Sequence, residues 1–515
     1  MKGFKFQLKV NYPETIILKS DGANASEKYL SALCNDTFLS LWSYPNLFRD
    51  EGRTDNKGDG KEICDLLVVF ERHVIIFSDK MWTFPSTDDI CLNWSRWYKK
   101  TIRDAEKQIR GAENHIKRQP DNIYLDSLCQ RKLPIKLPNK SDAIYHRIVV
   151  AHGASEACKQ YFSGGSGSLI IDTSIQGERH WRINGNDIAP FCVGQVNPSN
   201  GFVHVFDDVS LGIVMQTLDT VSDFVKYLDC KEIFLQSKYI NASGEEELLA
   251  EYLKNTDSHG RRSFISDIDD NDNVAGLTIL EGNWLDFCEH PSRLAQIEAN
   301  KVSYLWDGLI QKFLFHLTTG TSESISHPII CEQEAMFRIM AREDRTHRRA
   351  LSEALLDLFK NTPTSSRTTR VVFAQPTKTC YLFFLLPYMS GHTYEEYREV
   401  RKQLLSDYVY IVKSQIPNAL DIIGIAFETH APESQNHSED LVYLDARSWT
   451  SEDQEQAERL EQEFIEKGLL SSRSYYYKTI DEYPDIDKKR YKGRDRNKPC
   501  PCGSRKKYKK CCGTL

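Results

Sequence analysis

The final residues of this 515-residue chain contain four cysteines whose spacing could hold a metal ion. Cys500 and Cys502 are separated by one residue, and Cys511 and Cys512 are adjacent after a gap of eight residues. Four thiolates are a common tetrahedral shell for structural Zn²⁺, and Gly503-Ser504 supplies a turn at which the chain can reverse. The segment has little apolar material, so metal binding would supply most of its folding energy. We therefore expect one structural zinc ion held by these four cysteines.

This tail resembles the SEC-C motif, a small zinc module found at the C-terminus of the SecA translocation ATPase and on many other bacterial proteins. The pattern of Cys-x-Cys, eight residues, and then Cys followed by Cys or His is complete from Cys500 to Cys512. In the SecA family the motif is associated with the chaperone SecB and with ribosomes, so the resemblance implies docking of a partner. Two disulfides or a chance cluster are the alternatives, and the adjacent pair in a basic context favours metal.

A second group of polar residues lies near the N-terminus, within and after two apolar runs. Asp65 interrupts the predicted strand Ile63–Phe70, and Asp79 and Lys80 follow the predicted strand His73–Ser78. Phosphodiester hydrolysis commonly uses a divalent cation that polarises the phosphate and activates a water. Mg²⁺ and Mn²⁺ prefer carboxylate oxygens, which must converge on the ion. A lysine beside them can orient the water or offset the developing charge. The pattern therefore predicts a Mg²⁺ or Mn²⁺ site.

The order of helix, two strands and helix around these residues resembles the core of the PD-(D/E)XK nuclease superfamily, the restriction-endonuclease-like fold. The resemblance implies that Asp65 is a metal-binding carboxylate and Lys80 the motif lysine. It implies that Glu27 is a helix carboxylate near the metal, and it matches Gln108 loosely to a polar helix position. The sequence departs from the pattern at Ser78, where the family has Asp or Glu two residues before the lysine.

Asp79 could replace the missing carboxylate only if its strand stops or bulges after Phe77, because side chains alternate along a regular strand. With such an irregularity, Asp65, Asp79 and Lys80 would lie within a few ångströms of one another and form an active site. Without it, the site would be degraded and would only bind. An unrelated α/β fold is a third alternative, since a hairpin with carboxylates arises often by chance.

Hydrophobic periodicity predicts a mixed α/β (α+β) fold. Ser26–Phe38 is expected to be a helix capped by Ser26, and Trp94–Lys117 a long charged helix with Trp94 and Trp97 facing the core. Leu294–Leu317 and Glu332–Lys360 are expected to be long amphipathic helices. We expect a nuclease-like domain over 1–120, an α/β domain or its continuation over 121–270, a helical and mixed α/β domain over 271–470, a linker over 471–496 and the zinc module over 497–515.

Composition is that of an ordinary globular protein, with 40% hydrophobic and 27% charged residues. The first residues, Met1–Val10, lack the continuous apolar run of a signal peptide. We expect no membrane-spanning helix, because no stretch approaches 18 apolar residues. The ten cysteines outside the tail are scattered singly, mostly within apolar runs, as buried reduced thiols are. These features predict a cytoplasmic protein.

Charge is distributed unevenly along the chain. Lys488–Lys510 contains twelve Lys or Arg and one Asp, a net charge of +11, so the remaining residues carry −18 of the total of −7. A basic tail on an acidic body could contact phosphate groups, an acidic protein partner or the body itself. The alternative is a solvated run of charge without a partner.

Together these features predict a metal-dependent nuclease-like protein with a zinc-binding tail for partner docking. The combination resembles bacterial proteins of anti-phage defence, in which a nuclease-like domain is fused to sensing parts; that likeness is one of architecture alone. The alternative function is a non-enzymatic adaptor whose SEC-C tail docks a chaperone, a ribosome or another protein. Nucleic acid and a protein partner are thus the expected partners, with no membrane, and the oligomeric state is not predicted.

Overall fold

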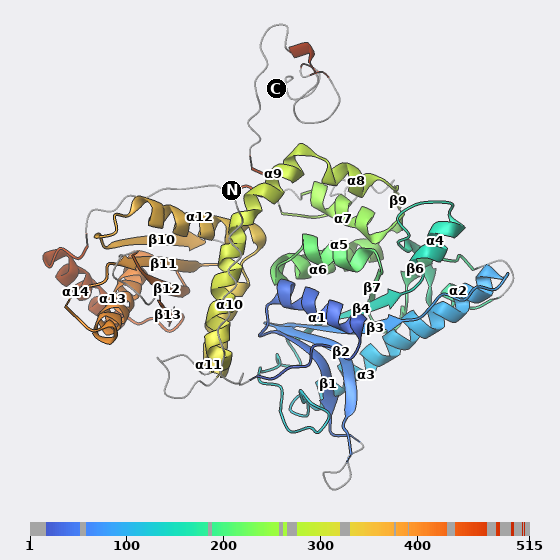
Figure 1. The fold of residues 1–515 in the computed structure, drawn as a ribbon, viewed down its shortest axis with the longest axis horizontal. Coiled ribbons are helices and arrows are strands. Elements are labelled where there is room, and N and C mark those ends of the chain that lie inside the picture. Colours follow the sequence, from blue (N-terminus) through green and yellow to red (C-terminus); the bar gives the residue numbers. More distant parts are fainter. Residues whose placement is uncertain are drawn as a thin grey trace. The chain divides into compact units, whose positions relative to one another are not determined.

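A computed structural model describes residues 17–51, 58–183, 188–256, 261–264, 276–319, 330–374, 377–389, 391–429, 438–470, 480–484, 496–498, 507 and 509. The chain divides into two compact units. The first contains residues 1–298, 309–344 and 483–515, and the second contains residues 299–308 and 345–482. Both combine helices with mixed sheets (Figure 1), so the predicted α+β class is confirmed.

The first unit is built on a five-stranded mixed sheet. Its strands lie in the order β1 (Ser43–Arg49), β2 (Lys61–Phe70), β3 (His73–Met81), β4 (Ile144–His152) and β7 (His204–Asp207). The pairs β1–β2 and β2–β3 are antiparallel, whereas β3–β4 and β4–β7 are parallel. The predicted hairpin is confirmed, since Glu71 and Arg72 join β2 to β3. Parallel pairing of β3 with β4 requires a crossover, which the intervening helices provide.

Helices cover both faces of this sheet. On one face lies α1 (Ala25–Phe38), whose Phe38 ring packs against Phe77 of β3. The other face is covered by α3 (Asp104–Arg118), whose Gln108 contacts Ser78, the next residue of the strand. Before α3, the chain forms α2 (Ile90–Tyr98) and the π-helical turn η1 (Lys99–Arg103), and the three run on as one helical segment along the sheet (Figure 1).

The start of α1 differs from the expectation. Asn24 is the N-cap, and its side chain accepts a hydrogen bond from the backbone N–H of Glu27 at 3.0 Å. The Glu27 carboxylate in turn accepts from the backbone N–H of Ala23 at 2.7 Å. Asn is as good a cap as Ser, and the returning Glu bond satisfies a further free N–H at this helix end. Ser26 therefore lies inside the first turn, where its hydroxyl is available for other contacts.

The rest of the first unit adds a second sheet and further helices. This four-stranded sheet has the order β6-β5-β8-β9. The elements are α4 (Ser155–Tyr161), β5 (Ile170–Gln176), η2 (Gly177–His180), β6 (Cys192–Gln195), α5 (Ser210–Thr217), α6 (Val221–Ser237), β8 (Tyr239–Ala242), α7 (Glu245–Lys254), β9 (Gly276–Ile279), α8 (Asn283–Cys288), α9 (Pro291–Asn300), α10 (Tyr304–Thr319) and α11 (Ile330–Ala341), with α9 and α10 divided between the units.

The second unit is a mixed four-stranded sheet with helices, in the order β10-β11-β12-β13. The central strands β11 and β12 are parallel and buried along their whole length, while the outer pairs are antiparallel. The elements are η4 (Lys301–Ser303), α12 (Arg345–Asn361), β10 (Thr368–Ala374), β11 (Thr379–Leu386), α13 (Tyr394–Gln415), β12 (Asp421–Glu428), β13 (Glu439–Asp445) and α14 (Ser451–Glu466).

Two helices that the sequence predicts as continuous are interrupted. The first is broken by the 3₁₀ turn η4, where the Ser303 hydroxyl donates to the carbonyl of Asn300 at 2.6 Å. The second ends at Ala341 and resumes at Arg345. Apolar periodicity persists through the first break, and the second lies in the polar run 342–349, which contains no proline or glycine to mark a helix end. The sequence alone therefore predicted single helices.

Candidate active site

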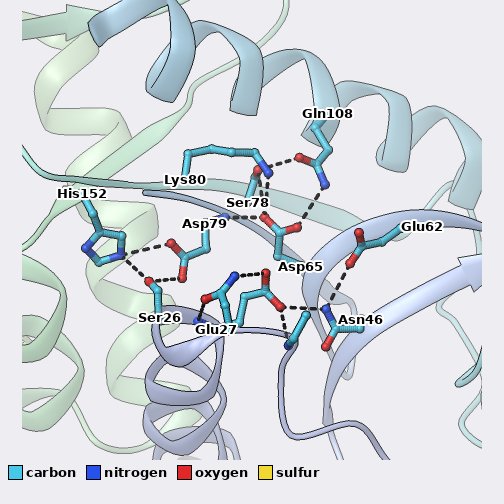
Figure 2. A network of polar contacts seen from close by, with 12 residues as sticks. Ser26, Glu27, Asn46, Glu62, Asp65, Ser78, Asp79, Lys80, Gln108 and His152 are labelled. Atoms are coloured by element: carbon cyan, nitrogen blue, oxygen red, sulfur yellow. Dashed lines mark hydrogen bonds and ion pairs between the residues drawn. The ribbon is translucent and has the colours of Figure 1, made fainter. Parts of the chain in front are cut away.

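The candidate site is centred on Asp65, whose side chain is only 4% exposed although it is a carboxylate. Asp65 lies on β2, one residue before the register pair Leu66–Phe77 at which β2 and β3 begin to pair. Its Oδ2 atom accepts from the backbone N–H of Asp79 at 2.5 Å and from Lys80 Nζ at 3.3 Å. Figure 2 shows this carboxylate at the centre of the polar network.

Two further donors complete the shell around Asp65. The Ser78 hydroxyl donates to Oδ2 at 3.2 Å, and the Gln108 amide donates to Oδ1 at 3.1 Å. Ser78 and Lys80 are two residues apart on β3 and so share the face that α3 covers. Burial raises the pKa of Asp65, and Lys80 with the hydrogen-bond donors opposes that rise. The arrangement places a buried carboxylate beside a partly exposed lysine.

A second pair of carboxylates is joined by Asn46. The Asn46 amide nitrogen donates to Glu27 at 2.9 Å and to Glu62 at 3.1 Å, so one side chain of β1 bridges α1 and β2 (Figure 2). Asn46 has φ +47°, a left-handed conformation that is uncommon for a residue other than glycine and clusters at functional sites. The bridge brings Glu27 to Glu62 at the edge of the sheet. The predicted role of Glu27 near a metal stays a prediction.

The Glu62 carboxylate also interacts electrostatically with Glu27, Asp65 and Lys80. Burial raises the pKa of Glu62, the negative charges of Asp65 and Glu27 raise it further, and Lys80 lowers it. Glu27, Glu62, Asp65 and Lys80 therefore lie close enough to influence one another. A cation at this place would relieve the repulsion among the three carboxylates.

Asp79 does not take the position that the sequence analysis required for it in the site. β3 continues to Met81 with an unbroken register against β4, from His73–Ile144 to Met81–His152, so it neither stops nor bulges after Phe77. Regular alternation then turns the Asp79 side chain away from Lys80. The expectation that the three side chains converge is correct for Asp65 and Lys80 only, and Asp79 contributes its backbone N–H.

The Asp79 carboxylate belongs instead to a second network with His152. Asp79 Oδ2 accepts from the Ser26 hydroxyl at 2.6 Å, and Oδ1 lies 3.1 Å from His152 Nε2. His152 Nδ1 is 2.9 Å from Asp208. Burial lowers the pKa of His152, but the hydrogen bonds and charges of Asp208 and Asp79 raise it to about 9. The raised pKa favours the imidazolium form between the two carboxylates, and these contacts join the first turn of α1 to the ends of β3 and β4.

Sequence reasoning named Asp65, Lys80 and Gln108, which hydrogen bonds join, and Glu27, which reaches Glu62 through Asn46. It missed the bridging role of Asn46 and the partners of Asp79, which are Ser26, His152 and Asp208. The Ser26 contact was hidden by the expected capping role. No local pattern marks the others, because each comes from an element that is distant in the chain.

The described residues do not form a complete metal-binding site from protein ligands alone. Within the described residues, no group of three His, Cys, Asp or Glu side chains has an arrangement that could hold a metal ion as it stands. Cys500, Cys502, Cys511 and Cys512 lie outside the described residues, as do the residues of Lys488–Lys510 other than 496–498, 507 and 509. The zinc assignment therefore stays a prediction.

Comparison with known proteins finds similarity over short parts of the chain. Residues 496–514 match the model of the SEC-C motif. Over 64 residues the chain is 47% identical to the protein translocase subunit SecA of Trichlorobacter lovleyi (strain ATCC BAA-1151 / DSM 17278 / SZ). That similarity covers 12% of this chain and 7% of the length of SecA. No solved structure matches the chain significantly. The SEC-C resemblance is thus confirmed, whereas these comparisons do not support the nuclease resemblance.

Proposed function

We propose that the first unit is a metal-dependent nuclease that hydrolyses phosphodiester bonds, with Asp65 and Lys80 at its centre. The observation that carries the proposal is the buried Asp65 carboxylate held 3.3 Å from Lys80, on two neighbouring strands. The order α1, β1, β2, β3, α3, β4 is consistent with the nuclease core that the sequence resembles. A perturbed carboxylate beside a lysine is a frequent feature of functional sites.

The donor set suits a hard divalent cation. Asp65, Glu62 and Glu27 offer carboxylate oxygens, which Mg²⁺ and Mn²⁺ prefer. Mg²⁺ keeps several waters and is commonly bound through one or two carboxylates, so it does not require a complete protein cage. The raised pKa values of Asp65 and Glu62 fit a place where positive charge is favoured. A bound metal would supply polarisation of the phosphate and a more acidic water.

The protein's own residues would divide the remaining tasks. Lys80 is partly exposed and can offset negative charge that develops on the phosphate, or orient the attacking water. Gln108 and Ser78 hold the Asp65 carboxylate in place through both of its oxygens. Ser78 itself cannot supply the carboxylate that the nuclease pattern has there, and we assign that task to Glu62, which approaches from β2.

The test is cleavage by the full chain of labelled single- and double-stranded DNA and RNA in Mg²⁺ and in Mn²⁺. We expect Asp65→Asn and Lys80→Ala each to lower the rate by about 100-fold or more, a typical effect of losing one catalytic group. The matched control is Asp142→Asn, which changes an exposed carboxylate outside the network. Cleavage that survives Asp65→Asn at the wild-type rate would overturn the proposal.

A second candidate function, the docking adaptor, is favoured by the SEC-C match over residues 496–514 and by the basic charge around it. Contacts of such a tail with a ribosome or an acidic chaperone should weaken steeply as salt rises. Cosedimentation with ribosomes across a salt series tests this, with Lys506, Lys507, Lys509 and Lys510 changed to Ala in the comparison chain. Binding that survives these changes or is insensitive to salt would exclude docking through the tail.

We place this function in the cytoplasm. Within the described residues, Cys34, Cys64, Cys91, Cys129, Cys158, Cys192, Cys230, Cys288 and Cys380 are free thiols, as in reducing compartments. Over the same residues, no helix is both long enough and apolar enough to cross a bilayer. The expected link to anti-phage defence stays a prediction from architecture.

A further inference from the structure

A run of positive charge lies on the helical segment that covers the candidate site. From Ile90 to Arg103 the sequence contains Arg96, Lys99, Lys100 and Arg103 and no Asp or Glu. Arg103 approaches the carboxylate of Asp104 at 3.5 Å. For Lys99 and Lys100, the described part of the chain offers no carboxylate within ion-pair distance. Exposed cations without acidic partners favour a negatively charged ligand.

Two tryptophans from other parts of the chain meet these cations. Lys99 Nζ lies 4.7 Å and the Arg103 guanidinium 5.3 Å from the ring centroid of Trp181. Lys100 Nζ lies 5.9 Å from the ring centroid of Trp82, whose side chain is 49% exposed. A cation over an exposed ring contributes only about 0.5–1 kcal/mol. We call the five residues Trp82, Trp181, Lys99, Lys100 and Arg103 the tryptophan platform.

Buried side chains hold the backbone of the platform in place. The indole N–H of Trp97 donates to the carbonyl of Trp82 at 3.0 Å, and the Ser95 hydroxyl donates to the carbonyl of Trp181 at 2.7 Å. Trp97 and Ser95 are almost fully buried, so these bonds are shielded from water. Gly153 has φ +97°, and a Cβ there would lie 2.3 Å from the Trp82 carbonyl, so only glycine fits. Both rings are thus presented from a fixed backbone.

The platform lies next to the candidate site in the sequence and in the fold. Trp82 follows Lys80 by two residues, at the end of β3. Lys100 precedes Gln108 by eight residues on the continuous helical segment, an axial distance of roughly 12 Å. The turn that carries the cations is π-helical, a rare conformation that is frequent at functional sites. A single extended strand could therefore contact the platform and the partly exposed Lys80 of the candidate site together.

We propose that the tryptophan platform binds single-stranded nucleic acid and directs it to the candidate site, an inference that rests on the proposed nuclease function. Aromatic faces beside cations match a chain of stackable bases joined by phosphates. In a duplex the bases are stacked on one another and their faces are hidden, so the rings would contribute little. A single strand is therefore the substrate form that this surface selects.

Binding is measured separately from cleavage, by fluorescence anisotropy of a labelled 12-nucleotide oligo(dT) or oligo(U) with the full chain in buffer without Mg²⁺ or Mn²⁺, and without a chelator that would remove the zinc of the tail. We expect Trp82→Ala to weaken binding by about 10-fold or more, as the loss of one stacked base does. Trp82→Phe should restore most of the affinity because it keeps a ring. Lys100→Ala should weaken binding and lessen its salt dependence. A matched control is Tyr239→Ala, which removes another exposed aromatic side chain.

The outcomes separate this inference from the proposed function. Weaker binding in Trp82→Ala, together with cleavage absent from the wild type in Mg²⁺ and Mn²⁺, would support the platform and overturn only the nuclease. Normal cleavage with unchanged oligonucleotide affinity in Trp82→Ala and Trp181→Ala would overturn only the platform. A wild-type protein that does not bind the oligonucleotides, or that binds a duplex of equal length more tightly, would also overturn it.

Discussion

The carboxylate of Asp65 accepts a hydrogen bond from the backbone N–H of Asp79 at 2.5 Å, while the carboxylate of Asp79 contacts Ser26 and His152 instead. The two acidic residues are therefore neighbours without being partners. Alternation along β3 explains the arrangement, because the side chains of Ser78 and Lys80 occupy the Asp65 face and that of Asp79 occupies the other. The two carboxylates should accordingly respond differently to the same substitution.

We expect Asp79→Asn to retain cleavage within about 10-fold of the wild type, because the backbone N–H that contacts Asp65 is unchanged. The substitution should instead cost about 1–3 kcal/mol of unfolding free energy, since Asp79 is buried against Ser26 and His152. Rates on nucleic acid and urea unfolding curves measure the two effects. Loss of activity equal to that of Asp65→Asn, with stability intact, would return Asp79 to the active site.

Stability should fall in alkaline solution because of His152. Its pKa is raised from an unfolded value of about 6.5 to about 9 in the folded protein, so the folded state binds the proton more tightly. The stabilisation is fully present below about pH 6.5 and is lost as the pH rises through 9. Its size is on the order of 3 kcal/mol. Denaturant unfolding between pH 6 and pH 10 measures it.

The comparison for this pH dependence is Asp208→Asn, which removes one of the two carboxylates that hold the imidazolium. That variant should be less stable at pH 7 and should lose less stability between pH 7 and pH 10 than the wild type. Parallel profiles of the two proteins would show that His152 is not the group responsible.

The tail should bind about one zinc ion per chain through Cys500, Cys502, Cys511 and Cys512. A chain that ends at Tyr491 should lose this metal while its far-UV circular dichroism and unfolding midpoint stay unchanged, since the tail would fold on its own metal. Elemental analysis of both purified chains measures the zinc. Metal that persists after truncation would refute the assignment to these cysteines.

Stability of the second unit should depend on one buried ion pair. Arg401 of α13 and Asp440 of β13 are almost fully buried and their atoms lie 2.6 Å apart. Asp440→Ala leaves a buried guanidinium without its carboxylate and should cost about 3–5 kcal/mol. The control on the same strand is Asp445→Ala, which removes the half-exposed partner of Arg447 and should cost about 1 kcal/mol or less. Similar losses in both variants would contradict the role of burial.

Several features of this protein could be predicted from local sequence patterns alone. The apolar runs of β2 and β3, the short turn between them and the helix predicted over Trp94–Lys117 follow from spacing within a few residues, and the structure has them. The SEC-C motif of the tail could likewise be recognised from the sequence, since its cysteine pattern is complete within Cys500–Cys512. Such features are readable because the interactions that produce them join residues close together in the chain.

Only the tertiary structure decided which polar groups meet. β3 continues past Phe77 because β4, about 70 residues later, pairs with it as far as Met81. That pairing turned Asp79 toward His152 and left Asp65 with Lys80. Asn46 likewise joins Glu27 to Glu62 from a left-handed conformation that its neighbours in sequence do not specify. The periodicity of a strand fixes which side chains share a face, but where the strand ends is set by its long-range partner.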